Sequence, residues 1–288
     1  MPRRLLAISL AILPLSLWGN ALGSESEAIA ASADSTAPHE SGSQDQQSTQ
    51  PATLAEAWLA WQERRHAEGQ APLDWAYSFA LRQEDAAEAS SHQARLVAEL
   101  RILGERLAIE GELEPAAGLN AWATAIQAAS SAPLRSPEPL GLPRLAADLR
   151  RNPSMAEIVH LGYCAPPSWL EAWTLSGVQR LPWHPGMQLD EALAMLPDEA
   201  LTGVAHARLI DPTGETHRLG IAAWNHQPAP LPPGSRLLAE LPDQLAAQPA
   251  TVKLINDRLS RYLARQLPGE ECEVQESRIH GAEGSRNE

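Results

Sequence analysis

The chain has 288 residues, a formal net charge of −14 at pH 7 and a pI near 5.1. A protein this acidic lacks the electrostatic footprint that binding to nucleic acid, or to anionic lipid over its whole surface, requires. It would also repel an acidic polysaccharide at long range, so binding of such a polymer would require local basic groups.

Met1–Gly23 has the pattern of a secretory signal peptide. Arginines precede an apolar run, Leu5–Trp18, which is too short to span a membrane comfortably. Ala21 and Gly23 follow at the positions that a signal peptidase reads. We therefore expect export and cleavage; a retained anchor helix is the alternative.

Two further segments are predicted to be disordered. Residues 24–51 form a linker of small and polar residues with almost no large apolar side chain, and the tail 268–288 is similar. Neither segment buries enough apolar surface to offset the entropy of ordering it. About 215 residues remain, enough for two small domains.

Residues 52–131 are predicted to form a helical hairpin or small bundle. Apolar side chains recur at spacings of three and four residues, which is one helical face. The clearest cases are Leu54, Trp58 and Trp61, and then the stripe Leu96, Leu100, Leu103 and Leu107. Gly111 is a plausible end of the second helix.

Prolines then interrupt the helical pattern. Seven of them fall between residues 131 and 175, and few helices tolerate that density. Ile158–Tyr163 and Trp169–Leu175 have the composition of short strands.

Residues 172–242 predict a small sheet crossed by one helix. Two extended pieces flank Gly177, and Pro185-Gly186 turns the chain into a short helix, Leu189–Leu196. The strands "GVAHARLI" and "ETHRLGIAAW" meet at the turn "DPTG", and "RLLAEL" is the last strand. This order makes an α+β unit with the outline of a β-grasp.

The same stretch resembles the soluble-ligand-binding (SLBB) β-grasp module of outer-membrane polysaccharide export proteins. The corresponding positions are Gly177-Val178, Pro185-Gly186, Leu189–Leu193, Gly214 and Pro233-Gly234. Ser235 stands where the module usually closes with an aspartate.

The wider layout, over residues 53–267 and best over 152–265, is similar to the capsule biosynthesis GfcC family. That resemblance implies an exported periplasmic protein of a Gram-negative bacterium. It also implies two β-grasp domains, a helical hairpin inserted in the first, and a C-terminal amphipathic helix. The first domain would comprise residues 132–171 and the second residues 172–242. Because residues 24–51 contain no strand, the first domain is either incomplete or receives its missing strands from a partner.

Residues 251–267 predict an amphipathic helix with net positive charge. Its apolar residues share one face. Its basic residues lie off that face, namely Lys253, Arg258, Arg261 and Arg265. The helix either docks on its own sheet with a solvated basic face, or it engages a partner or the inner surface of the outer membrane.

The two cysteines, Cys164 and Cys272, permit one disulfide in an exported protein. Closing a loop of that length would stabilise the protein by about 4–5 kcal/mol in the chain-entropy model. Two unpaired thiols are the alternative. Neither cysteine has a second cysteine at zinc-ligand spacing.

No catalytic motif is present: the chain lacks G-x-S-x-G, H-E-x-x-H and a phosphate-binding glycine loop. His206 and His217 fall on one predicted hairpin, where pairing could bring them near each other. With Asp211 they are the best residues for an enzyme, although a solvent-facing pair is the simpler interpretation. The GfcC family carries a pocket arginine just after its helical insertion. Arg135 is the residue that corresponds best to it by order along the chain; the alternative is that Arg135 is an ordinary surface residue.

We therefore expect a non-enzymatic periplasmic accessory protein of capsule or exopolysaccharide assembly or export, with no cofactor and no metal. Its partner would be a polysaccharide or an outer-membrane export component, and not a nucleic acid. Arg135, His206 and His217 are the candidate ligand-binding residues. The alternatives are a polysaccharide-modifying enzyme and a structural subunit that a partner strand completes.

Overall fold

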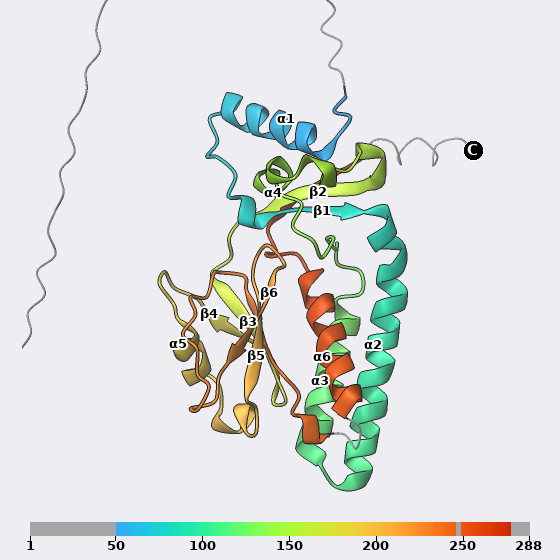
Figure 1. Ribbon diagram of the computed structural model, residues 1–288, viewed down its shortest axis with the longest axis vertical. Helices are drawn as coiled ribbons and strands as arrows, with labels where there is room; N and C mark the ends of the chain where they lie inside the picture. The colour runs from blue at the N-terminus through green and yellow to red at the C-terminus, as the bar shows by residue number, and fades with distance from the viewer. Residues whose placement is uncertain (1–49, 246–248, 278–288) are drawn as a thin grey trace, which may run out of the picture. The chain divides into compact units, whose positions relative to one another are not determined.

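The computed structural model describes residues 50–245 and 249–277, which form a mixed α+β structure (Figure 1). The predicted signal peptide, most of the predicted linker and the end of the tail lie outside the described residues. Within the described ranges there are six α-helices and two β-sheets. None of these helices is both long and apolar enough to cross a membrane.

The first helix, α1 (Leu54–Ala67), begins at a capping box. The Thr53 hydroxyl accepts the Glu56 N–H, and the Glu56 carboxylate accepts the Thr53 N–H. The predicted apolar face of this helix is buried, with Trp58 fully covered and its indole N–H donating to the Leu140 carbonyl at 2.9 Å.

That face packs on a three-stranded antiparallel sheet in the order β1-β2-β8. Its strands are β1 (Ser78–Arg82), β2 (Ile158–Cys164) and β8 (Cys272–Glu276). The short helix α4 (Leu142–Ala147) contacts α1 over the same cluster.

Two sequence predictions are wrong here. Residues 52–131 are not helical throughout, because β1 lies between α1 and the next helix. The tail is not disordered from residue 268, because β8 pairs with β2 from Cys164↔Cys272 to His160↔Glu276. The third strand of this sheet thus comes from the same chain.

The long helix α2 (Gln83–Glu110) and α3 (Leu113–Ala128) form a hairpin. Gly111 ends α2 with a left-handed φ of 90°, which favours glycine. The hairpin packs close to the sheet that follows: a Cβ on Gly118 would lie 1.9 Å from the Leu175 carbonyl oxygen. The Trp122 indole N–H donates to the Thr174 carbonyl at 2.8 Å.

The second sheet has five strands in the order β4-β3-β7-β5-β6. The strands are β3 (Trp169–Thr174), β4 (Gly177–Pro182), β5 (His206–Ile210), β6 (Thr216–Gly220) and β7 (Arg236–Ala239). β3 and β7 are parallel, and the other neighbours are antiparallel. All five strands, and α5 (Leu189–Ala194), occur in the order that the sequence predicted.

Helices cover both faces of this sheet, as Figure 1 shows. Alternate residues of a strand point to opposite faces. Ile210 and Leu238 therefore pack with α2, α3 and the last helix, α6 (Pro249–Ala264). Their neighbours Leu209 and Leu237 pack with α5.

Candidate functional site

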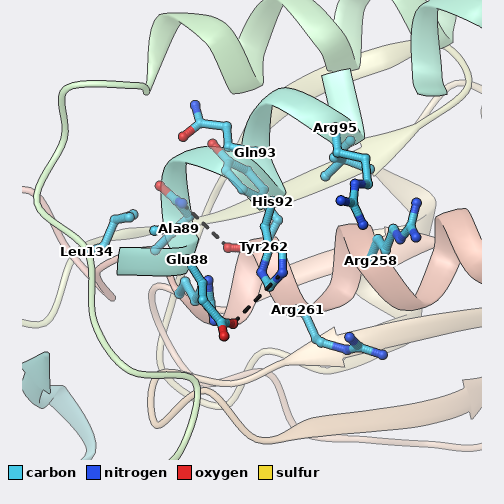
Figure 2. Close-up of a pocket in the computed structure, with 12 residues that line it drawn as sticks. Glu88, Ala89, His92, Gln93, Arg95, Leu134, Arg258, Arg261 and Tyr262 are labelled. Atoms are coloured by element: carbon cyan, nitrogen blue, oxygen red, sulfur yellow. Dashed lines mark hydrogen bonds and ion pairs between the residues drawn. The ribbon is translucent and has the colours of Figure 1, made fainter. Parts of the chain in front are cut away.

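A polar cavity lies between α2 and α6 and has a volume of about 330 Å³ (Figure 2). One wall comes from α2, with Glu88, His92 and Arg95 among its polar residues. The facing wall carries Arg258 and Arg261 of α6, and Arg265 just beyond the helix end. We call this cavity the α2–α6 cleft.

Helical spacing explains both walls. Glu88, His92 and Arg95 are four and three residues apart, and the three arginines of the other wall are three and four apart, so each set shares one face. The opposite face of α6 carries Ile255, Leu259 and Leu263, and all three are buried in the core. Burial of that apolar face turns the basic face toward α2.

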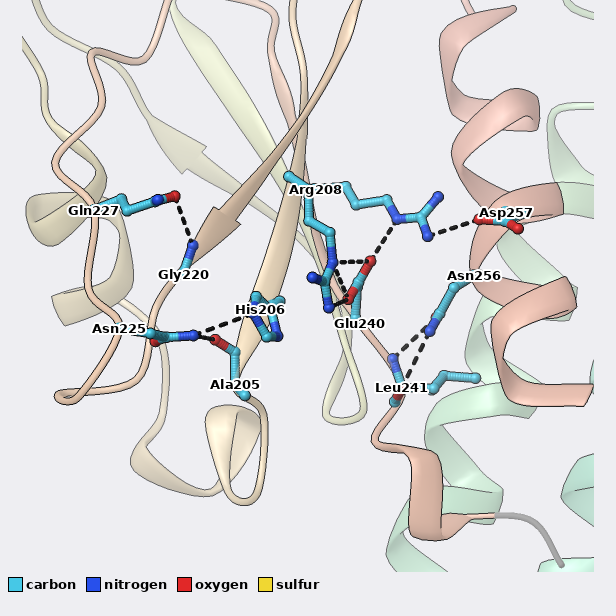
Figure 3. Close-up of polar contacts among 11 residues, drawn as sticks. Ala205, His206, Arg208, Gly220, Asn225, Gln227, Glu240, Leu241, Asn256 and Asp257 are labelled. Carbon is cyan, nitrogen blue, oxygen red and sulfur yellow. Dashed lines mark hydrogen bonds and ion pairs between the residues drawn. The ribbon is translucent and has the colours of Figure 1, made fainter. Parts of the chain in front are cut away.

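Polar contacts fix the rotation of α6 on the sheet (Figure 3). Arg208 of β5 donates to Glu240 at 2.6 Å and to Asp257 of α6 at 2.7 Å. The Asn256 side chain accepts the Leu241 N–H at 3.0 Å and donates to the Leu241 carbonyl at 3.2 Å. A buried amide satisfied in this way allows α6 one rotational setting.

The ionisation of these groups follows from their neighbours. Burial alone would raise the pKa of Glu240, but hydrogen bonds from Arg218 and Arg208 outweigh it and lower the pKa. Burial alone would lower the pKa of Arg208, and its bonds to Glu240 and Asp257 raise it instead. Glu240 and Arg208 are therefore both charged near neutral pH.

Ion pairs occupy only part of the basic wall. Arg258 is paired with Glu99 of α2, and Arg265 lies 3.3 Å from Asp85. Arg95 and Arg261 are exposed and have no hydrogen-bond or ion-pair partner among the described residues. Figure 2 shows Arg95 and Arg258 reaching toward the same end of the cleft. The cleft thus holds two arginines that are available to a ligand.

The basic residues predicted for the last helix are not equivalent. Arg258, Arg261 and Arg265 line the cleft, whereas Lys253 is exposed on the same helix and does not line it. The sequence did not predict that α2 contributes His92 and Arg95 to the cleft. They lie on a regular helical face, but the sequence pattern does not say that α6 packs against that face.

Arg135 is buried, with 2% of its surface exposed, so the surface alternative is wrong. Its Nε donates to the Ala264 carbonyl at 2.8 Å, and its Nη1 donates to the Pro212 carbonyl. Burial, and then repulsion by Arg236, lower its pKa to about 9. Arg135 joins the end of α6 to the β5–β6 turn and does not line the cleft.

His206 and His217 do not face one ligand. His206 pairs with Gly220, and His217 pairs with Leu209. Directly paired residues share a face, so His206 lies on the face of Arg208 and His217 on the face of Leu209. His206 contacts Asn225 (Figure 3), with Nε2 and the Asn225 Nδ2 3.2 Å apart.

Asp211 lies beside His217 in the β5–β6 turn, with Oδ2 3.4 Å from Nε2. Ligand atoms of Asp211, Glu215 and His217 lie within 4.8 Å of one another, a spacing that could hold a metal ion. However, Asp211 Oδ1 accepts from the Thr213 N–H and hydroxyl and from the Glu215 N–H. These bonds are what an aspartate contributes to a tight turn, and they account for its position.

Comparison with known proteins finds a family model that matches a segment in the second half of the chain. Residues 177–268 match the family model described as capsule biosynthesis GfcC C-terminal. The matched region runs from β4 to the end of α6, and so includes the basic wall of the cleft. No curated protein matches the chain.

Proposed function

We propose that this protein acts in capsule or exopolysaccharide biosynthesis or export, because residues 177–268 match the family model of the capsule biosynthesis GfcC C-terminal region. It acts in the periplasm as a non-enzymatic accessory protein, by binding a glycan or a component of the export machinery. The observation that carries the proposal is the family match together with a cleft whose basic wall lies inside the matched region.

The topology of the second sheet supports a β-grasp domain of the kind that the sequence indicated. Two hairpins, β3–β4 and β5–β6, are joined by a segment that contains α5, and β7 lies between them and runs parallel to β3. This strand arrangement agrees with a β-grasp. Modules of this type present surfaces and clefts to ligands, which agrees with a binding role.

The periplasmic location is supported by two features. Residues 1–23 have the signal-peptide pattern, and Cys164 and Cys272 form a disulfide with an S–S distance of 2.08 Å. Disulfides persist in oxidising compartments such as the bacterial periplasm and are rare in the cytosol.

A binding role, as opposed to catalysis, is supported by the placement of the best enzyme candidates. His206 and His217 lie on opposite faces of the sheet. A general acid and base must both reach the reacting atoms within hydrogen-bond distance, and residues on opposite faces cannot do so.

The proposal is tested by deleting the gene in a strain that makes capsule and measuring surface polysaccharide. We expect surface polysaccharide to fall and to return when the full chain is supplied from a plasmid. Unchanged surface polysaccharide in the deletion strain would contradict the proposal. A double variant, His206→Ala with His217→Ala, should restore the polysaccharide as well as the unaltered chain does.

A further inference from the structure

We propose that the α2–α6 cleft binds an acidic saccharide unit, and that the unpaired arginines of its two walls, Arg95 and Arg261, contact its acidic groups. This inference rests on the proposed function and names the ligand class of the same cleft. Neither the resemblance nor the family match specifies an acidic ligand or assigns a role to α2.

The charges in the cleft favour an anion. Glu88 is the one carboxylate among its described lining residues, against four arginines. Glu99 and Asp85 neutralise Arg258 and Arg265 from outside the lining. Arg95 and Arg261 remain without partners, one on each wall. These two unpaired guanidinium groups favour a ligand that carries negative charge.

The chemistry of the guanidinium group narrows the class of anion. Arginine donates two parallel hydrogen bonds to a carboxylate or a phosphate, a geometry that lysine does not offer. Besides His92, the basic residues that line the cleft are four arginines. The lining is thus suited to planar, two-point recognition of an acidic group.

The remaining lining suits the rest of a sugar. Gln93 donates its amide N–H to the Ile126 carbonyl at 2.7 Å, which leaves its side-chain oxygen to accept a hydroxyl. His92 is exposed, with Nε2 3.8 Å from Glu88 Oε2 (Figure 2), while Ala89 and Leu96 contribute apolar lining. A volume of about 330 Å³ is at the lower end of the range for small-molecule sites, so a short unit fits better than a long chain segment.

The acidic body of the protein does not prevent this binding. At physiological ionic strength charges are screened over about 8 Å, so distant carboxylates act weakly on a ligand in the cleft. Direct contacts with Arg95 and Arg261 are much less screened. The overall charge instead disfavours loose binding of the acidic polymer elsewhere on the surface.

The test is titration calorimetry on the full exported chain with three probes. These are a galacturonic-acid trimer, glucose 1-phosphate and the neutral galactose trimer. We expect at least one of the two anionic probes to bind and the neutral trimer not to bind. Equal binding of the neutral and acidic trimers, or no binding of either anionic probe, overturns the inference.

Paired variants locate the binding. Arg95→Gln with Arg261→Gln should weaken binding of the anionic probe at least tenfold. The matched control is Arg101→Gln with Lys253→Gln, which removes the same charge from the same two helices outside the cleft and should bind as the unaltered chain does. Thermal melts check that both variants fold. Equal losses in the two variants overturn the assignment to the cleft.

A lipid headgroup offers the same phosphate chemistry, so vesicles form a further arm. One outcome is that the protein binds phosphatidylglycerol vesicles and neither saccharide anion, and that the double variant Arg95→Gln with Arg261→Gln abolishes this binding. This result would overturn the saccharide ligand and identify a membrane surface as the ligand of the cleft. The deletion experiment separates the two proposals. Suppose that deletion of the gene removes the capsule, and that the double variant, which does not bind the anionic probe, restores it fully. This result would reject the acidic ligand and leave the proposed function standing.

Discussion

Arg135 and Glu240 show two ways in which this protein accommodates a buried charged side chain. Arg135 has backbone carbonyls as its hydrogen-bond acceptors, and its Nη2 is buried without a partner among the described residues. Glu240 instead accepts from two arginines, Arg208 and Arg218. Only the second arrangement lowers the cost of burying both charges, because each ion neutralises the other.

Replacing Glu240 by Gln should lower the free energy of unfolding at pH 7 by about 2 kcal/mol, because Arg208 and Arg218 lose a charge-assisted acceptor. Glu240 has a lowered pKa in the folded protein. Its stabilising contribution is therefore present above the pKa of the unfolded chain and is lost as the pH falls through the folded value.

Urea unfolding from pH 7 down to pH 3 measures this contribution. The difference between the unaltered chain and Glu240→Gln should be largest near neutrality and should shrink below about pH 4.5. Glu105→Gln, at an exposed position of α2 with no ion pair in the described structure, is the control and should change little. A difference independent of pH would contradict the assignment to this carboxylate.

At the same scale, the sequence predicted residue types better than residue roles. The basic stripe of α6 was predicted, and three of its four members line the cleft. The burial of Arg135 was not predicted, because it depends on how the end of α6 meets the turn after β5. No local pattern encodes that contact.

Among the elements, those with regular local patterns were predicted and those defined by partners were not. Alternation and turn residues predicted all five strands of the second sheet. β1 was missed because "SFALR" lies between two strongly helical stretches, and its pairing with β2 outweighs local propensity. β8 was missed because its sequence is polar and four of its five residues are exposed.

The packing of α3 on the second sheet depends on a missing side chain at Gly118. A Cβ there would lie 1.9 Å from the Leu175 carbonyl oxygen, and that neighbour is backbone. Gly118→Ala should therefore force α3 away from the sheet and lower the free energy of unfolding by about 1–3 kcal/mol.

Gly104→Ala in α2 is the matched control. Its Cβ would come no closer than 3.4 Å to a neighbour, the Ala116 carbonyl oxygen. Alanine is a better helix former than glycine by up to about 1 kcal/mol, so this variant should be neutral or more stable. Chemical denaturation compares the two variants, and similar behaviour of both would refute a close approach at Gly118.

At the scale of the whole molecule, β8 connects distant parts of the chain. It pairs with β2 across a separation of 108 residues at the disulfide, and Ser277 continues the contact with an N–H donated to the Val159 carbonyl at 2.9 Å. Missing strands were expected because residues 24–51, which precede the helices, have no strand pattern, whereas the third strand of this sheet follows the helices. Sequence patterns carry no information on a strand that returns from so far along the chain.

A chain that ends at Pro268 should therefore be less stable than one that ends at Ser277. The shorter chain loses β8 and the disulfide, while the longer one keeps both. Within the longer chain, Cys164→Ser with Cys272→Ser should lower the free energy of unfolding by up to about 4–5 kcal/mol.

Thermal melts of these three proteins check the order. The unaltered longer chain should melt highest, the double serine variant lower, and the shorter chain lowest, because it lacks the strand as well as the bond. A shorter chain that melts with the unaltered longer one would show that β8 contributes nothing to stability.

The position of β8 also determines the order in which the protein can fold. A chain emerges from the ribosome with its N-terminus first, so α1, β1 and β2 are available long before residues 272–276. The five strands of the second sheet span only residues 169–239 and can pair with short loop closures. The β1-β2-β8 sheet, whose first strands come early in the chain, is thus the last to be completed. Until β8 pairs, one edge of β2 is open to pairing with wrong partners.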